Sequence, residues 1–154
     1  MPEVITTDSA FSKAQQDVLA IIVDMMIPAE GEMPSAADAG IFTSILTRME
    51  DNEPVMAKAL KIIEELSRQQ GDDSFLQLDQ LTQQAVIDTF RSEQEELTQL
   101  LQLNTVASYY QDDRVMNMLG LEARPPHPGG YEVEKTDWSI LDPVRAKEKF
   151  YRAT

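Results

Sequence analysis

The chain has 154 residues with 27 acidic and 13 basic side chains, which gives a formal net charge of −14. Its length suits one domain, and 42% hydrophobic with 26% charged residues is typical of a globular protein. So acidic a balance argues against nucleic acid as a partner and against an anionic membrane surface. Cysteine is absent, which excludes disulfides, thiol nucleophiles and sulfur-bound metals. The longest apolar run, residues 18–27, is too short to span a bilayer, so we expect no membrane insertion.

The first half of the chain predicts three helices. Ser12, with a glutamine three residues later, has the pattern of a capping box, and Pro28 ends the helix that follows. Ser35 is the predicted cap of a second helix. Pro54 suits the first turn of a third helix, which ends near Gly71. The apolar residues that recur at helical spacing are Val18, Ile22, Met25, Met26, Ile41, Ile45, Leu46, Met49, Val55, Ala59, Ile62, Ile63 and Leu66.

Three more helices are predicted before residue 120. One begins at Asp79, and another begins at Ser92, which forms a second capping-box pattern with Glu95. A short helix spans residues 113–119. The helix after Ser92 has the strongest pattern, with Leu97, Leu100, Leu101, Asn104, Ala107 and Ser108 along it. No alternation of useful length predicts a strand.

These elements predict an all-α fold. We expect an N-terminal extension at residues 1–11, a compact helical bundle at 12–120 and a Pro-rich C-terminal arm at 121–154. The arm ends in a short helix, because Asp142 followed by Pro143 is typical of a helix start. Acidic and basic residues balance within the arm, so the whole net charge lies before it.

The arm is too rich in apolar and aromatic residues for a disordered tail. Two surfaces could cover it: the bundle of its own chain, on which it would pack, or a partner protein that it would clasp. Both can hold at once. Aromatic anchors dominate many interfaces. The candidate partner-binding residues are Tyr131, Trp138, Ile140, Leu141, Phe150, Tyr151 and His127.

Motifs of catalysis and metal binding are scarce. His127 is the single histidine, which excludes the paired histidines of common zinc and di-iron sites. A general base needs an orienting partner and a pocket, so we expect His127 to be solvated or at an interface.

Asp88 and Arg91 have the spacing of a solvated helical pair. Met25 and Met26, or Met116 and Met118, suit either the core or an adaptable partner contact. We therefore expect no catalytic residue, metal or cofactor in this chain.

Two stretches carry a family resemblance. The first is VDMMIPAEGEMPSAADAGIFTSI at residues 23–45, a helix ending in Asp-x-x-Ile-Pro-Ala, an acidic loop and an Ala-Gly before the next helix. The second, at residues 109–145, is YYQDDRVMNMLGLEARPPHPGGYEVEKTDWSILDPVR. In this order they resemble the gluconate 2-dehydrogenase subunit 3 family, the small (gamma) subunits of flavin-dependent sugar and polyol dehydrogenases. The similarity is expected over residues 12–152.

The resemblance implies a non-catalytic accessory subunit without its own cofactor. Its partner would be a large oxidoreductase subunit of the glucose-methanol-choline class, which carries FAD and the catalytic residues and oxidises a sugar, polyol or glycoside. In many such systems a cytochrome c subunit takes the electrons, and the small subunit carries the export signal.

No Sec-type or twin-arginine signal precedes Ser12, so we expect a cytoplasmic location for the chain as written and a periplasmic one for a mature form. The alternative function is a stand-alone acidic helical module that binds a protein and has no redox partner. A third and weaker hypothesis is an enzyme that uses His127 with a nearby carboxylate.

Overall fold

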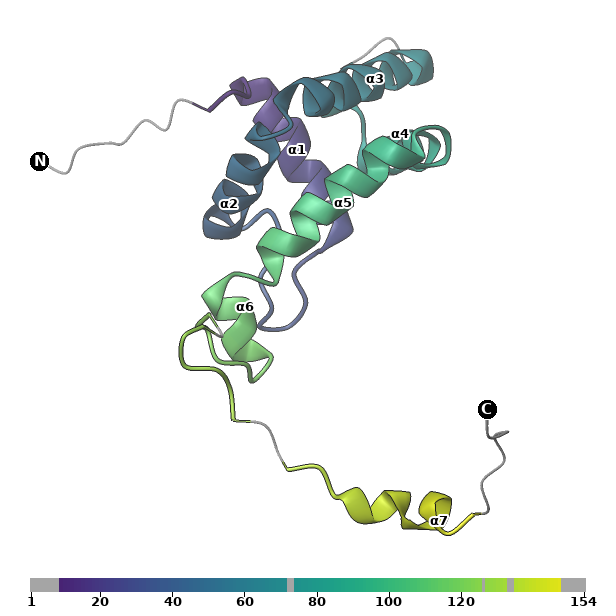
Figure 1. Cartoon of the computed structure of the whole chain (residues 1–154). Helices are drawn as coiled ribbons and strands as arrows, with labels where there is room; N and C mark the ends of the chain where they lie inside the picture. Colours follow the sequence, from purple (N-terminus) through teal and green to yellow (C-terminus); the bar gives the residue numbers. More distant parts are fainter. Residues whose placement is uncertain (1–8, 72–73, 126, 133–134, 148–154) are drawn as a thin grey trace, which may run out of the picture. The chain divides into compact units, whose positions relative to one another are not determined.

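The computed structural model describes residues 9–71, 74–125, 127–132 and 135–147. These residues form helices and no β-strand, so the predicted all-α fold is confirmed (Figure 1). The helices are α1 (Lys13–Met26), α2 (Ala39–Glu50), α3 (Glu53–Gly71), η1 (Phe75–Gln77), α4 (Gln80–Glu93), α5 (Glu95–Tyr109), α6 (Asp113–Met118), η2 (Trp138–Leu141) and α7 (Asp142–Arg145). Here η marks a 3₁₀ helix.

The chain divides into two compact units, residues 1–123 and residues 124–154. The first unit contains α1 to α6, and the second contains η2 and α7. Within the first unit α5 packs against α2 and α4, and α4 also packs along α3. The helix α3 contacts α2, α4, α5 and η1, and α5 contacts α2, α3 and α4, so these two helices connect most of the elements of the unit.

The hydrophobic core belongs to the first unit. Among the described residues, no buried side chain lies beyond Val115. Burying a Leu, Ile or Phe side chain contributes about 1.5–3 kcal/mol, so this core is the main source of stability. Its largest fully buried side chains are Phe11, Leu19, Ile22, Val23, Ile41, Ile45, Met49, Met56, Ile63, Phe75, Phe90 and Leu101.

Two of the predicted helix starts are confirmed. The Ser12 hydroxyl accepts from the Gln15 amide at 3.4 Å, and the Gln15 side chain accepts from the Ser12 amide at 2.8 Å. The Asp79 carboxylate accepts from the Thr82 amide at 3.0 Å, and this bond, with a second one from the Thr82 hydroxyl, lowers the pKa of Asp79. The third helix contains Pro54 in its first turn and ends at Gly71, as its sequence predicts.

Two other predicted starts are wrong. The second helix begins after Asp38, whose carboxylate accepts from the Gly40 amide, while the Ser35 hydroxyl caps only the preceding turn. Ser92 lies inside α4, where its hydroxyl donates to the Thr89 carbonyl at 2.8 Å. The helix α5 begins after Gln94, whose side chain makes no capping bond. A hydroxyl that bonds back to its own helix cannot cap the next one.

The loop between α1 and α2 is fixed to α5. Glu30 and Met33 exchange two backbone hydrogen bonds around Gly31, which has a φ of 59°. The Tyr109 hydroxyl donates to the Pro34 carbonyl at 2.8 Å. This bond holds the loop, and with it the end of α1, beside the C-terminal part of α5.

In the second unit, a side-chain cap and a proline mark the start of the short helical segment. The Asp137 carboxylate accepts from the Ser139 amide at 2.9 Å, and its hydrogen bonds with Ser139 lower the pKa of Asp137. This cap begins η2, and Pro143 follows in the first turn of α7. The predicted short helix in the arm is confirmed at residues 138–145. In the described part of the chain, no helix has the length and apolar character needed to cross a membrane.

Candidate functional site

The predicted partner-binding residues of the arm are mostly exposed. Trp138 is 64% and Ile140 68% exposed, and Leu141 is partly exposed. Phe150 and Tyr151 lie outside the described residues. The short helical segment thus presents a bulky aromatic side chain and an aliphatic one, which suits recognition of another surface.

The Pro-rich segment before this helix closes on itself. The Arg124 guanidinium lies over the Tyr131 ring, with Cζ 4.6 Å from the ring centroid, and the Tyr131 hydroxyl donates to the Arg124 carbonyl. His127 lies between these two residues in the chain and is exposed. The geometry therefore brings Tyr131 to Arg124 and gives His127 no described hydrogen-bond partner that would orient it as a base.

The helix α5 has two faces of unusual composition. Its buried face carries Thr98, Asn104, Thr105 and Ser108 beside its leucines. Its outer face carries three large apolar side chains, Leu103, Val106 and Tyr110, the last of them the C-cap residue, which are 66%, 44% and 52% exposed. The outer face of a helix on a globular protein is normally polar, so the exposed apolar side chains make the outer face of α5 a candidate contact surface.

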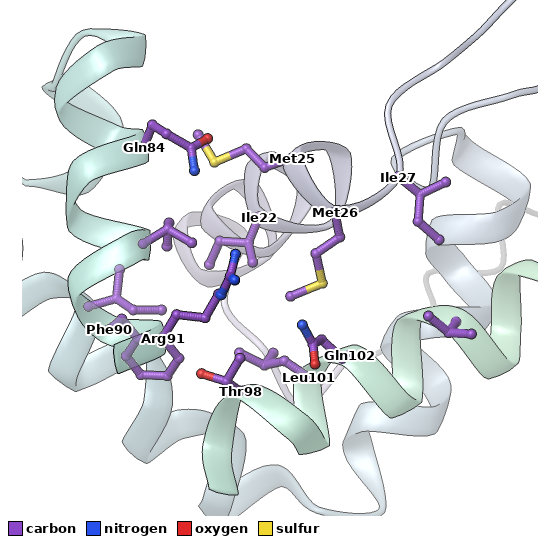
Figure 2. Close-up of a pocket in the computed structure, with 13 residues that line it drawn as sticks. Ile22, Met25, Met26, Ile27, Gln84, Phe90, Arg91, Thr98, Leu101 and Gln102 are labelled. Atoms are coloured by element: carbon purple, nitrogen blue, oxygen red, sulfur yellow. The ribbon is translucent and has the colours of Figure 1, made fainter. Parts of the chain in front are cut away.

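A cavity of about 360 Å³ opens beside this face of α5. Its lining comes from α1, α3, α4 and α5 and the residue that ends α1, and Val106 belongs both to the lining and to the outer face of α5. In Figure 2, Met26 of α1 faces Leu101 and Gln102 of α5 across the space, and Met25 lies beside Gln84 of α4. The further lining residues are Ile22, Ile27, Ile63, Gln84, Ile87, Phe90 and Arg91. The wall is mainly aliphatic and thioether, which suits an apolar group.

One hydroxyl group in the cavity wall has no hydrogen-bond partner among the residues that the structure describes. Thr98 is 7% exposed, and its Oγ1 is buried without a partner. Other helical threonines, such as Thr43, Thr89 and Thr105, donate to the carbonyl four residues earlier. Figure 2 shows the Thr98 oxygen turned towards α4. A buried hydroxyl without a partner costs about 1–3 kcal/mol, so an acceptor or donor at this point would be stabilising.

Arg91 is the single charged side chain of the lining. Figure 2 shows it extending from α4 towards α1. Asp88, its expected neighbour, instead accepts from the Gln84 side chain at 3.3 Å. Among the described residues, no ion pair or hydrogen bond to the Arg91 guanidinium is found, so the predicted pair with Asp88 does not form.

Two other arginines of the first unit, Arg114 and Arg48, donate to carboxylate, amide or hydroxyl oxygens, whereas Arg68, which is exposed like Arg91, has no ion pair or hydrogen bond among the described residues. Arg114 donates to Asp38 at 2.7 Å and to Asp112 at 3.1 Å, which joins the start of α6 to the start of α2. The Arg114 hydrogen bond lowers the pKa of Asp38; burial alone would raise that of Asp112, but hydrogen bonds from Arg114 and Val115 lower it overall. In a polar hollow of about 570 Å³, Arg48 donates to Ser108 and Gln111.

The groups that the described residues bring together are suited to binding another molecule. Within the described residues, no group of three or more His, Asp or Glu side chains could hold a metal ion. What the first unit brings together is an apolar helix face, a cavity, one guanidinium and one buried hydroxyl. The sequence pattern indicated two methionine pairs as possible partner contacts, Met25 with Met26 and Met116 with Met118, of which only the first lines this cavity. It missed the outer face of α5 and Thr98.

Comparison with known families assigns the chain. The family of gluconate 2-dehydrogenase subunit 3 matches residues 13–129, a shorter range than the 12–152 expected from the two motifs. The match covers α1 to α6 and ends before η2. No curated protein and no solved structure matches the chain. The chain therefore belongs to the gluconate 2-dehydrogenase subunit 3 family, whose name describes a small subunit of a dehydrogenase complex.

Proposed function

We propose that this chain is a non-catalytic accessory subunit that stabilises an FAD-dependent large subunit of the glucose-methanol-choline class. The large subunit carries the FAD and the catalytic residues, and it oxidises a sugar, a polyol or a glycoside. The observation that carries this proposal is the family match over residues 13–129.

Two features of the structure support a role in assembly. The arm segment exposes Trp138 and Ile140, and the outer face of α5 exposes Leu103 and Tyr110. An exposed patch of apolar side chains often marks an interaction site. We assign Trp138 as the main anchor of the arm, with Tyr131, Ile140 and Leu141 beside it, because tryptophan is enriched among residues that dominate binding energy.

The proposed stabilisation is a mass-action effect. A subunit that binds only the folded large subunit shifts that protein's folding equilibrium, by about 2.7 kcal/mol when its free concentration is 100 times the dissociation constant. The large subunit made alone should therefore be less soluble, and retain less FAD, than the same subunit made with its partner.

Co-expression tests the proposal. The flavoprotein would be produced alone and together with the full chain, and its soluble yield, FAD absorbance near ~450 nm and dehydrogenase turnover would be compared. We expect all three to rise with the small subunit present. A large subunit that is soluble, fully loaded with FAD and fully active by itself contradicts the proposal.

The electron acceptor and the location belong to the same proposal. We propose a cytochrome c subunit as acceptor, and a cytoplasmic location for the chain as written or a periplasmic one for a mature form. Reduction of an added c-type cytochrome by the purified complex, and fractionation of cells that produce the chain, are the corresponding measurements. Turnover with a soluble dye but none with any c-type cytochrome contradicts the first part.

A further inference from the structure

The outer face of α5 has the composition of a buried surface. Leu103, Val106 and Tyr110 follow one another at spacings of three and four residues, so they form one stripe along the end of the helix. All three are at least 44% exposed. A helix that is apolar on both its inner and its outer face is normally covered on both sides.

The stripe adjoins the cavity. Val106 belongs to both; Met26 lies across the space from α5, and Met25 also lines the cavity, beside Gln84 of α4 (Figure 2). Both methionines are only partly buried and pack against the core. Thioether side chains adapt to the shape of an incoming group, so this wall suits an apolar side chain from outside the chain.

The positive charge of Arg91 at the cavity favours an acidic group next to the incoming apolar side chain. Arg91 is the single charged lining residue, and no described side chain pairs with it although the chain carries a net charge of −14. The Thr98 hydroxyl in the same wall has no hydrogen-bond partner in the described part of the chain either. Both groups can donate to an oxygen, and a carboxylate is the acceptor that arginine binds most strongly.

We infer that the outer face of α5 and the neighbouring cavity bind an apolar segment of the large flavoprotein subunit, with one carboxylate of that segment paired to Arg91. This inference rests on the proposed function, because it takes its partner from there. A second copy of this chain is disfavoured as the occupant, because two chains that each carry a charge of −14 repel one another.

Substitutions on the exposed stripe test the inference. The full chain carrying Leu103→Gln and Val106→Gln, and a second variant carrying Arg91→Gln, would be titrated with the purified large subunit. We expect each to weaken the complex about tenfold or more, as for residues near the centre of an interface. The variants should keep the melting temperature of the wild type, since these side chains are not part of the core.

The chain supplies matched controls. Leu81 is 85% exposed on α4 and does not line the cavity, and Arg68 is an exposed arginine on α3. Leu81→Gln and Arg68→Gln should change the dissociation constant by less than about twofold, because isolated surface changes have small effects. If the stripe variants bind as tightly as these controls, the inference is overturned while the proposed function stands. If the wild-type chain does not bind the flavoprotein at all, both fall.

A photo-cross-linking residue distinguishes the occupants. Placed at position 103 in the full chain, it should join α5 to a peptide of the large subunit, whereas the same residue at position 81 should not. A product with residues 124–154 of the same chain, or with a second copy, overturns the inference, as does the absence of any product in the assembled complex.

Discussion

Two hydroxyl groups of the first unit have opposite energetic roles. The Ser12 hydroxyl accepts from the Gln15 amide and is half of a reciprocal capping box. It therefore gives a hydrogen-bond acceptor to an amide that has no carbonyl partner within the helix. We expect Ser12→Ala to lower the free energy of unfolding by about 1 kcal/mol. Ser12→Asn, which keeps a capping group, is the control. Urea denaturation measures both, and equal stabilities of Ser12→Ala and wild type would contradict the assignment.

Thr98 is the opposite case, because no described residue forms a hydrogen bond with its buried hydroxyl. Thr98→Val keeps the shape and removes the unsatisfied group, so we expect the free energy of unfolding of the isolated chain to rise by about 1 kcal/mol. Thr105→Val is the matched control, since the Thr105 hydroxyl donates to the Leu101 carbonyl at 2.8 Å. Thermal unfolding compares the two, and a loss of stability as large for Thr98→Val as for Thr105→Val would refute this reading.

Capping residues also show how far the sequence predicts structure at this scale. Ser12 and Asp79 could be identified because each has a single helix to cap. Ser92 could not, because its hydroxyl has a competing acceptor, the Thr89 carbonyl, within α4. The choice between the two bonds depends on where α4 ends, and the capping pattern alone does not determine that.

At the scale of elements, Tyr109 connects the loop after α1 to α5. It is 2% exposed, and its hydroxyl donates to the Pro34 carbonyl. We expect Tyr109→Phe to lower the free energy of unfolding at pH 7 by about 1 kcal/mol, the usual net contribution of such a bond. Because this bond positions the end of α1, the variant should also loosen the wall of the cavity formed by Met25 and Met26.

The same residue predicts a pH dependence. Burial, with smaller contributions from Tyr110 and Asp112, raises the pKa of Tyr109 in the folded chain. A raised folded-state pKa gives stability that is complete below the unfolded value of about 10 and is lost as the pH rises through the folded value. The advantage of wild type over Tyr109→Phe should therefore shrink above about pH 10. Urea titrations at neutral and alkaline pH measure it, and a constant difference would contradict this assignment.

Helical periodicity predicted α5 and its buried face, but not its outer apolar face. Leu97, Leu101, Asn104 and Ser108 are buried, as the pattern predicts. The stripe of Leu103, Val106 and Tyr110 was missed, because a helix with apolar residues on two sides gives no signal of which side faces the core. The cavity could not be predicted either, since its walls come from four helices that are distant in the sequence.

At the scale of the whole molecule, Trp138 tests whether the arm contributes to assembly. It is 64% exposed, so its removal leaves the core of the first unit intact. We expect Trp138→Ala to weaken the complex with the large subunit by about 2 kcal/mol, as for an interface anchor. Val144→Ala, another exposed apolar residue of the same segment, is the control. Native mass spectrometry that finds an unchanged complex for Trp138→Ala would remove Trp138 from the interface.

The two units also differ in what their sequences can specify. The first unit has its own hydrophobic core, and among the described residues every buried side chain lies at or before Val115. Its fold could therefore be predicted from helical periodicity. The apolar residues of the arm predict that it must be covered, but their pattern does not distinguish the first unit from a partner protein as the covering surface.

Deleting residues 124–154 tests this difference. Since the core lies in residues 11–115, we expect the shortened chain to retain its helical circular dichroism and to unfold with a free energy within about 1 kcal/mol of the full chain. Its affinity for the large subunit should fall by at least as much as that of Trp138→Ala, because the anchor and its neighbours are removed together. A shortened chain that unfolds would show that the core depends on the arm. One that binds as tightly as the full chain would leave α5 and its cavity as the sole docking surface.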